Sequence, residues 1–103
     1  MPSYVRVSVS ARIVDGKALG IEIQEEVSER VSSLIGQGVA PHLAVVIAGD
    51  DPASHVYVRN KERACERCGI ISTRIDMPGS SNLEEILEVV NSLNSDPNIH
   101  GIL

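Results

Sequence analysis

The apolar run over residues 43–48 constrains the fold more than any other stretch of this chain. It contains no polar residue and no alternation, and it is rich in β-branched side chains, which is typical of a strand buried on both faces of a parallel sheet. The loop over residues 49–52 breaks the strand, and Ser54 can cap a helix that ends near Cys68, with Gly69 as its left-handed C-terminal cap. Ligands of open α/β sheets bind outside the carboxyl ends of the strands, so this junction is the expected site.

Tyr57 and Lys61 are four residues apart in the expected helix, so their side chains project from one face. Ala64, Cys65 and Cys68 continue that face, and we expect it to be turned toward the protein. A buried ammonium ion needs a partner, and desolvation brings a lysine toward the range in which it acts as a general acid or base. Tyrosine offers a ring for stacking and a hydroxyl group for a hydrogen bond. A snorkelling lysine beside a half-buried tyrosine is the alternative, and the spacing alone favours it.

Helices and strands alternate in the rest of the sequence. The expected elements are a short or edge strand over residues 4–9, a helix capped by Asp15 and ending near Ile35 with Gly36 after it, a strand over residues 70–75, a helix capped by Ser81 or Asn82 and ended by Asp96-Pro97, and a strand over residues 99–103. The first and last helices each carry an apolar stripe that should pack on the sheet. The stripe of the first helix is Leu19, Ile23, Val27, Val31, Leu34 and Ile35, and that of the last helix is Leu83, Ile86, Leu87, Val90 and Leu93. This order predicts a three-layer α/β/α fold with a mainly parallel sheet.

Composition narrows the class of protein. A chain of 103 residues allows one small domain, and the absence of Phe and Trp makes its core aliphatic. The formal net charge of −5 argues against nucleic acid as a partner, because binders of the phosphate backbone normally carry a basic face. No stretch resembles a membrane span or the apolar region of a signal peptide, so we expect no membrane partner and a cytoplasmic protein.

Other motifs in the sequence favour structural roles. Cys65 and Cys68 form a C-x-x-C inside a helix, without a second ligand pair, which favours two buried thiols over a redox or zinc site. The three histidines show no metal-binding spacing. The glycines of Gly36-Gln37-Gly38 follow a helix rather than a strand, and Pro41 stands where a dinucleotide loop needs its third glycine. Asp50 and Asp51 are expected to shape the loop, because adjacent side chains point apart.

Four patches in order resemble the N-terminal domain of the methylenetetrahydrofolate dehydrogenase/methenyltetrahydrofolate cyclohydrolase family. In that family a strand ends in a Gly-Asp-Asp or related loop, followed by Ser, Tyr-x-x-x-Lys and Lys-x-x-Ala-x-x-x-Gly-Ile. The central patch here contains Gly49-Asp50-Asp51, Ser54, Tyr57 to Lys61 and Lys61 to Ile70. The other three patches are Asp15 to Leu19, Pro41 to Ala44, and Leu93 to Asp96 together with His100 to Leu103. The resemblance runs from about Ile13 to the end of the sequence.

The resemblance implies an enzyme of one-carbon metabolism and purine biosynthesis. It would oxidise 5,10-methylenetetrahydrofolate with NADP and hydrolyse the methenyl product to 10-formyltetrahydrofolate. Lys61 is implied as the central catalytic residue, for proton transfer and the activation of water; Tyr57 would stack on or orient the tetrahydrofolate, and Ser54 would hydrogen-bond near Lys61. A homodimer is implied, usually paired through the second domain.

Residues 1–103 are then expected to be the N-terminal catalytic domain, incomplete at its C-terminus because its last strand is cut at Leu103. In the family, Gly-Ile-Leu continues into Val-Gln-Leu-Pro-Leu-Pro, and a second, Rossmann-type domain that binds NADP follows; neither occurs in this sequence. A piece of this kind is expected to be inactive by itself. The alternative is a non-catalytic small α/β module for folate binding or assembly.

Overall fold

The computed structural model describes residues 4–6 and 10–103. Its elements are β1 (Tyr4–Arg6), β2 (Arg12–Val14), α1 (Gly16–Gly36), β3 (His42–Ala48), α2 (Pro52–Cys68), β4 (Ile71–Met77), α3 (Leu83–Asn94) and β5 (Gly101–Ile102). β1 begins the strand that was expected over residues 4–9, and residues 7–9 lie outside the described part. β2, which pairs with β1 in an antiparallel arrangement, was not predicted.

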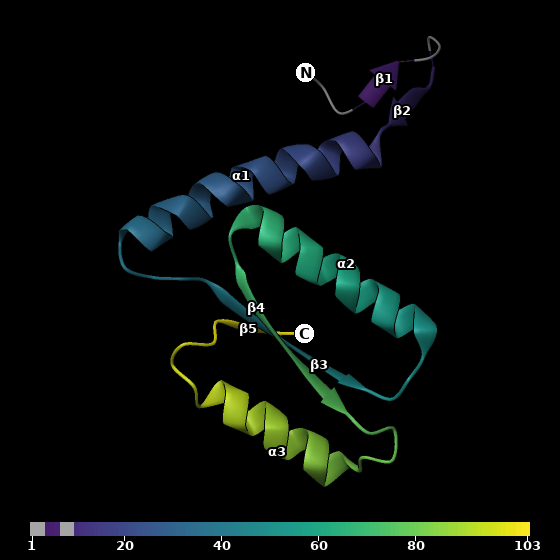
Figure 1. Ribbon diagram of the computed structural model, residues 1–103. Coiled ribbons are helices and arrows are strands. Elements are labelled where there is room, and N and C mark those ends of the chain that lie inside the picture. Colours follow the sequence, from purple (N-terminus) through teal and green to yellow (C-terminus); the bar gives the residue numbers. More distant parts are fainter. Residues whose placement is uncertain (1–3, 7–9) are drawn as a thin grey trace.

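A parallel three-stranded sheet organises the domain, in the order β4-β3-β5. α1 and α2 lie on one side of this sheet and α3 on the other (Figure 1). The register places His42 beside Ile71 and Ala48 beside Met77, so β3 and β4 pair over their whole lengths. β5 contributes only two residues to the sheet. The predicted α/β/α class with a parallel sheet is confirmed.

The core lies where α2 crosses the central strand. Val45 and Ile47 of β3 pack with Val58 of α2, and Leu43 adds a partly buried side chain. Ala44 is fully buried. Because β3 is flanked by strands on both edges and helices on both faces, its continuous apolar run is the pattern that this position requires. The strand that was predicted over residues 43–48 is therefore confirmed, with His42 added at its start.

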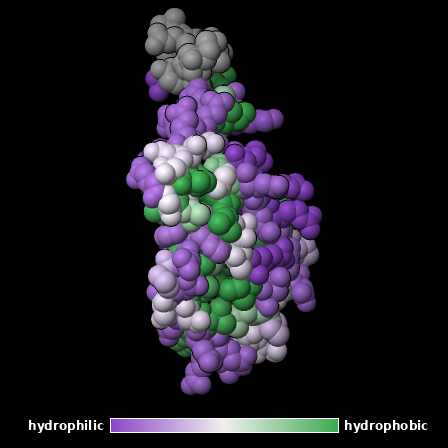
Figure 2. Space-filling model, turned by 60° about the vertical axis from the view of Figure 1, so that its left-hand side comes forward, coloured by the Kyte–Doolittle hydropathy of each residue, from purple (hydrophilic) through white to green (hydrophobic). Residues whose placement is uncertain are grey.

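The apolar stripes of α1 and α3 are covered less than the sequence predicts. Val31 is the only buried residue of α1, and α3 has none. α1 packs mainly against α2, and its Val31 side chain lies beside Gly69 at the end of that helix. The expectation that the whole apolar stripe of α1 packs on the sheet was therefore wrong. Large apolar side chains accordingly remain exposed, including Ile23, Ile35 and Leu83. Figure 2 shows apolar residues in a band down one face, bordered by polar residues on either side.

Helix ends differ from the predictions in two places. Asp51, not Ser54, caps α2, because Pro52 takes the first helical position and the Asp51 carboxylate accepts a hydrogen bond from the backbone N–H of Ala53 at 3.0 Å. α1 runs through Gly36, and the left-handed backbone falls at Gly38, with φ of 90°. The predicted caps at Asp15, Gly69 and Asn82 are confirmed; β4 begins and ends slightly later than expected, and β5 is shorter.

Candidate functional site

A hollow of about 470 Å³ opens between β3, the first two turns of α2 and Leu103. Most of its lining residues are aliphatic, and its two polar side chains, Ser54 and Tyr57, come from α2. Because the hollow lies along the carboxyl-terminal half of β3, it has the position that ligands take in open α/β sheets. The sequence-predicted residues Ser54 and Tyr57 thus line one concave surface.

The turn before α2 is held in place at Gly49. Gly49 has a φ of 95°, a conformation that favours glycine, and its N–H donates to the carbonyl oxygen of Met77 at 3.0 Å. The loop after β4 approaches so closely that a Cβ atom at Gly79 would lie 3.4 Å from the Cα atom of Gly49. These contacts hold Gly49 against the end of β4 and the loop that follows it.

Lys61 lies next to the hollow through its contact with Tyr57. Its Nζ atom is 5.5 Å from the centroid of the Tyr57 ring, within the range of a cation–π interaction. Both side chains are exposed, and Tyr57 keeps 52% of its surface accessible. The expectation that they face inward was therefore wrong. They do share a face with Cys68, but α1 covers only the Cys68 end, while the Tyr57 end opens onto the hollow.

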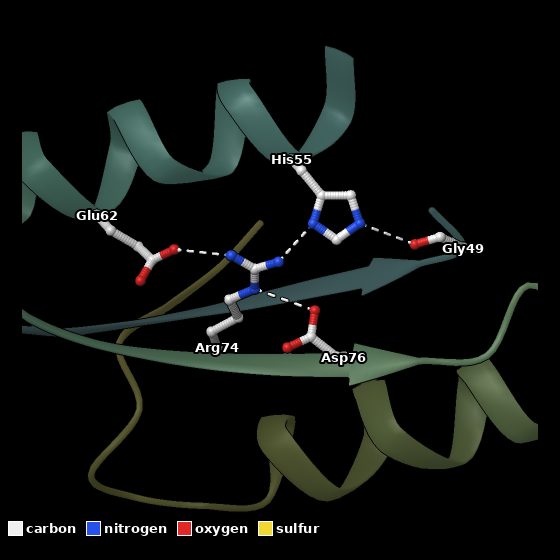
Figure 3. Close-up of polar contacts among 5 residues, drawn as sticks. All are labelled: Gly49, His55, Glu62, Arg74 and Asp76. Atoms are coloured by element: carbon white, nitrogen blue, oxygen red, sulfur yellow. Dashed lines mark hydrogen bonds and ion pairs between the residues drawn. The ribbon is translucent and has the colours of Figure 1, made fainter. Parts of the chain in front are cut away.

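A polar cluster on the other flank of α2 was not predicted (Figure 3). His55 projects from α2 toward Arg74 of β4, whose Nη2 donates to His55 Nδ1. His55 Nε2 donates to the carbonyl oxygen of Gly49 at 3.0 Å. Arg74 also pairs with Asp76 at 3.0 Å and Glu62 at 3.4 Å, and the hydrogen bond to Asp76 raises the pKa of the guanidinium group. No motif indicates this cluster, because its members come from separate elements.

The cysteines and the remaining histidines hold secondary structure together. Cys65 and Cys68 are buried, free thiols, and burial raises the pKa of Cys65, which disfavours the reactive thiolate. Cys68 donates to the backbone oxygen of Gln24 in α1 at 3.6 Å. At the amino-terminal ends of the strands, the His42 backbone N–H donates to His100 Nδ1 at 3.2 Å. Across residues 4–6 and 10–103, the structure gathers no group of three or more side chains that could hold a metal ion.

A larger hollow, of about 610 Å³, lies away from these residues. It runs beside α1, where Gly16 and Gly20 leave the helix surface bare, and reaches Arg67 at the end of α2. It contains none of Ser54, Tyr57 and Lys61, so its size does not make it the candidate site. In the described part of the chain, no helix is both long and apolar enough to cross a membrane.

Comparison with known proteins gives a consistent result. The family model for the tetrahydrofolate dehydrogenase/cyclohydrolase catalytic domain matches residues 14–103. The chain is 53% identical over 95 residues to the bifunctional protein FolD of Bordetella bronchiseptica, covering 92% of this chain and 34% of that protein. It is 52% identical over 93 residues to FolD of Moorella thermoacetica, covering 90% of this chain and 33% of that protein. The chain thus spans about a third of the length of these relatives.

Solved structures resemble the chain over similar lengths. The bifunctional FolD methylenetetrahydrofolate dehydrogenase/cyclohydrolase of Campylobacter jejuni superposes with a TM-score of 0.84 at 44% identity, over 86% of this chain and 32% of that one. The FolD enzyme of Trypanosoma brucei, crystallised with NADP and an inhibitor, gives a TM-score of 0.83 at 30% identity, over 100% of this chain and 33% of that one.

Proposed function

This chain belongs to the tetrahydrofolate dehydrogenase/cyclohydrolase family, and from that premise we propose that it supplies the N-terminal, folate-binding part of an enzyme of one-carbon metabolism. The proposed reactions are the NADP-dependent oxidation of 5,10-methylenetetrahydrofolate and the hydrolysis of the methenyl product to 10-formyltetrahydrofolate. The observation that carries the proposal is the Tyr57–Lys61 pair at the rim of the hollow along β3. The aliphatic walls suit a flat ring system, and Lys61 adds a cationic group beside the Tyr57 ring.

Each candidate residue has a chemical task in this proposal. Hydrolysis adds water to the methenyl carbon and then breaks one of its two C–N bonds, so the water oxygen loses both of its protons. One proton goes to the leaving nitrogen and the other is released. Lys61 is the proposed group for these proton transfers, because its Nζ lies over the ring that lines the hollow. Tyr57 stacks on the folate, and Ser54 supplies a hydroxyl group for a hydrogen bond at the start of α2.

Helix starts in the described residues do not fit the pyrophosphate of NADP. Asp15 and Asp51 cap α1 and α2 through their side-chain carboxylates, and α3 carries Glu84 and Glu85 in its first turn. These carboxylates occupy or shield the amides that would bind a phosphate group, and their charge repels it. We therefore propose that NADP is held by residues outside these 103.

A polypeptide of residues 1–103 should accordingly fail to bind NADP. Its sequence has no glycine-rich phosphate loop, and its helix starts are acidic. Isothermal calorimetry with NADP should give only the heat of dilution, while circular dichroism shows that the polypeptide is folded. A saturable, stoichiometric signal would place the cofactor site in these residues after all.

Tyr57 should tolerate phenylalanine better than alanine. Phenylalanine keeps the stacking ring and loses one hydrogen bond, so folate affinity should fall by less than about threefold. Alanine removes the ring, and affinity should fall by about tenfold. Binding is measured by calorimetry with a tetrahydrofolate derivative. Equal losses in the two variants would show that the ring is not what binds.

The proposed function is tested on the protein at its natural length. Purified protein should hydrolyse 5,10-methenyltetrahydrofolate and should reduce NADP when given the methylene form. Saturable folate binding without turnover would instead support the second candidate, a non-catalytic folate-binding or assembly module. The exposure of Tyr57 and Lys61 is the observation that favours this second candidate.

Family membership further supports a cytoplasmic homodimer that serves purine biosynthesis, which we propose as the cellular setting. Its partners are tetrahydrofolate derivatives and a second copy of the protein. Analytical ultracentrifugation of the protein at its natural length tests the dimer, since a single monomeric species across concentrations contradicts it.

A further inference from the structure

We propose that His55 and Arg74 are positioning residues that hold the first two turns of α2, and with them Ser54 and Tyr57, over the hollow. This inference rests on the proposed function for its kinetic test. The Tyr-x-x-x-Lys motif includes neither His55 nor Arg74, and neither residue lines the hollow. Their effect on the site is therefore exerted through the helix and the loop before it.

The contacts around His55 define its proton arrangement. A guanidinium group has only donors, so His55 Nδ1 must accept from Arg74, and the ring proton is on Nε2. Nε2 donates that proton to the carbonyl oxygen of Gly49. His55 thus connects the arginine of β4 with the peptide that leaves β3, in one chain of hydrogen bonds (Figure 3).

These bonds lie on the opposite flank of α2 from the site. Successive helical residues are about 100° apart, so His55 and Glu62 face β4 while Ser54 and Tyr57 face the hollow, with Val58 between them on the core side. Arg74 contacts both His55 and Glu62, which are two turns apart on the β4 flank. Two contacts at separate levels resist rotation of the helix about its axis, and such a rotation would move Tyr57 relative to the walls of the hollow.

The same cluster fixes the loop that starts α2. Gly49 is held through its N–H by Met77 and through its carbonyl oxygen by His55. The loop leads directly to Asp51, whose carbonyl oxygen accepts from the backbone N–H of His55 at 3.1 Å. Loss of the His55 side chain would free one side of this loop while leaving the buried contacts of Val58 intact. The change should therefore affect ligand geometry more than overall stability.

The test compares His55→Leu with His55→Gln in the protein at its natural length. Leucine removes both hydrogen bonds, whereas a glutamine amide can still donate to the carbonyl oxygen and accept from Arg74. We expect His55→Leu to raise the KM for the folate substrate about tenfold with kcat changed less than about twofold, because small displacements of binding groups weaken productive binding strongly. His55→Gln should restore most of the wild-type KM. Arg59→Leu, which changes an exposed residue of the same helix, should leave KM unchanged.

A second measurement separates this inference from the proposed function. The NMR signals of the Tyr57 ring, assigned with Tyr57→Phe, should shift in His55→Leu and return toward their wild-type positions in His55→Gln. If the wild-type protein turns over no folate, the proposed function fails, and the ring signals still test the positioning. Unchanged ring signals in His55→Leu, an unchanged KM in an active protein, or a glutamine variant no better than leucine would each overturn the inference.

Discussion

Replacement of Lys61 by methionine should abolish hydrolysis of 5,10-methenyltetrahydrofolate in the protein at its natural length. Methionine keeps much of the length of the side chain and removes the ammonium group. The loss should exceed the roughly 10²–10⁴-fold that is usual for one acid–base group, because the ammonium group also orients the substrate beside the Tyr57 ring. The rate is followed by the disappearance of the methenyl substrate, with folding checked by circular dichroism.

Lys17 provides the matched control for this experiment. It is the other lysine of the sequence, it is exposed on α1, and it lies outside the hollow beside α2. Lys17→Met should therefore hydrolyse the substrate at the wild-type rate. A Lys61→Met protein with near-normal hydrolysis would remove Lys61 from the proposed mechanism.

Replacement of Val45 by aspartate should unfold the domain. Val45 is 1% exposed at the centre of β3 and packs in the small cluster with Ile47 and Val58. An unpaired carboxylate buried at this position should lower the free energy of unfolding by about 4 kcal/mol or more. A domain typically has a total stability of about 5–15 kcal/mol. Thermal unfolding followed by circular dichroism measures the effect, and we expect no cooperative transition for this domain.

The control for the core substitution is Val56→Asp. Val56 is 56% exposed on α2, so a carboxylate at this position stays in water. This variant should unfold near the wild-type temperature. Equal destabilisation by the two substitutions would contradict the assignment of the core to the β3–α2 contact.

Sequence alone predicts the alternation of helices and strands because its main signals are local. The apolar run of β3, the cap at Asp15 and the left-handed glycine at Gly69 each depend on neighbouring residues. The start of α2 was misplaced because Ser54 and Asp51 are both good N-caps, and Pro52 decides between them. β2 was not predicted because it has only three residues, Arg12–Val14, which is too short for an alternating pattern to mark it.

The sequence predicted that Tyr57 and Lys61 share a helical face, but it did not predict that this face is exposed. Spacing places Tyr57 and Lys61 on one helical face, and the structure brings them together. Whether that face is buried depends on what lies against it, and α1 reaches only its far end, at Cys68. Their catalytic roles remain predictions.

Residues that act through tertiary contact left no signal in the sequence. His55 and Arg74 come from a helix and a strand that meet only after the chain has folded. A histidine on a helix and an arginine in a strand are each unremarkable without the other. The register of β3 and β4 sets the position of Arg74 opposite the start of α2, and no local pattern predicts that register.

The parallel pairing of the central sheet also determines the order in which the protein can be assembled. β3 pairs with strands that lie much later in the sequence, since Leu43 is beside Ser72 in β4 and beside Gly101 in β5. During synthesis on the ribosome, this most apolar strand therefore emerges before either of its partners exists. Non-local pairing of this kind is slow, and an unpaired aliphatic strand is prone to associate with other chains. The same segment that anchors the finished core is thus the one that most needs protection while the protein is being made.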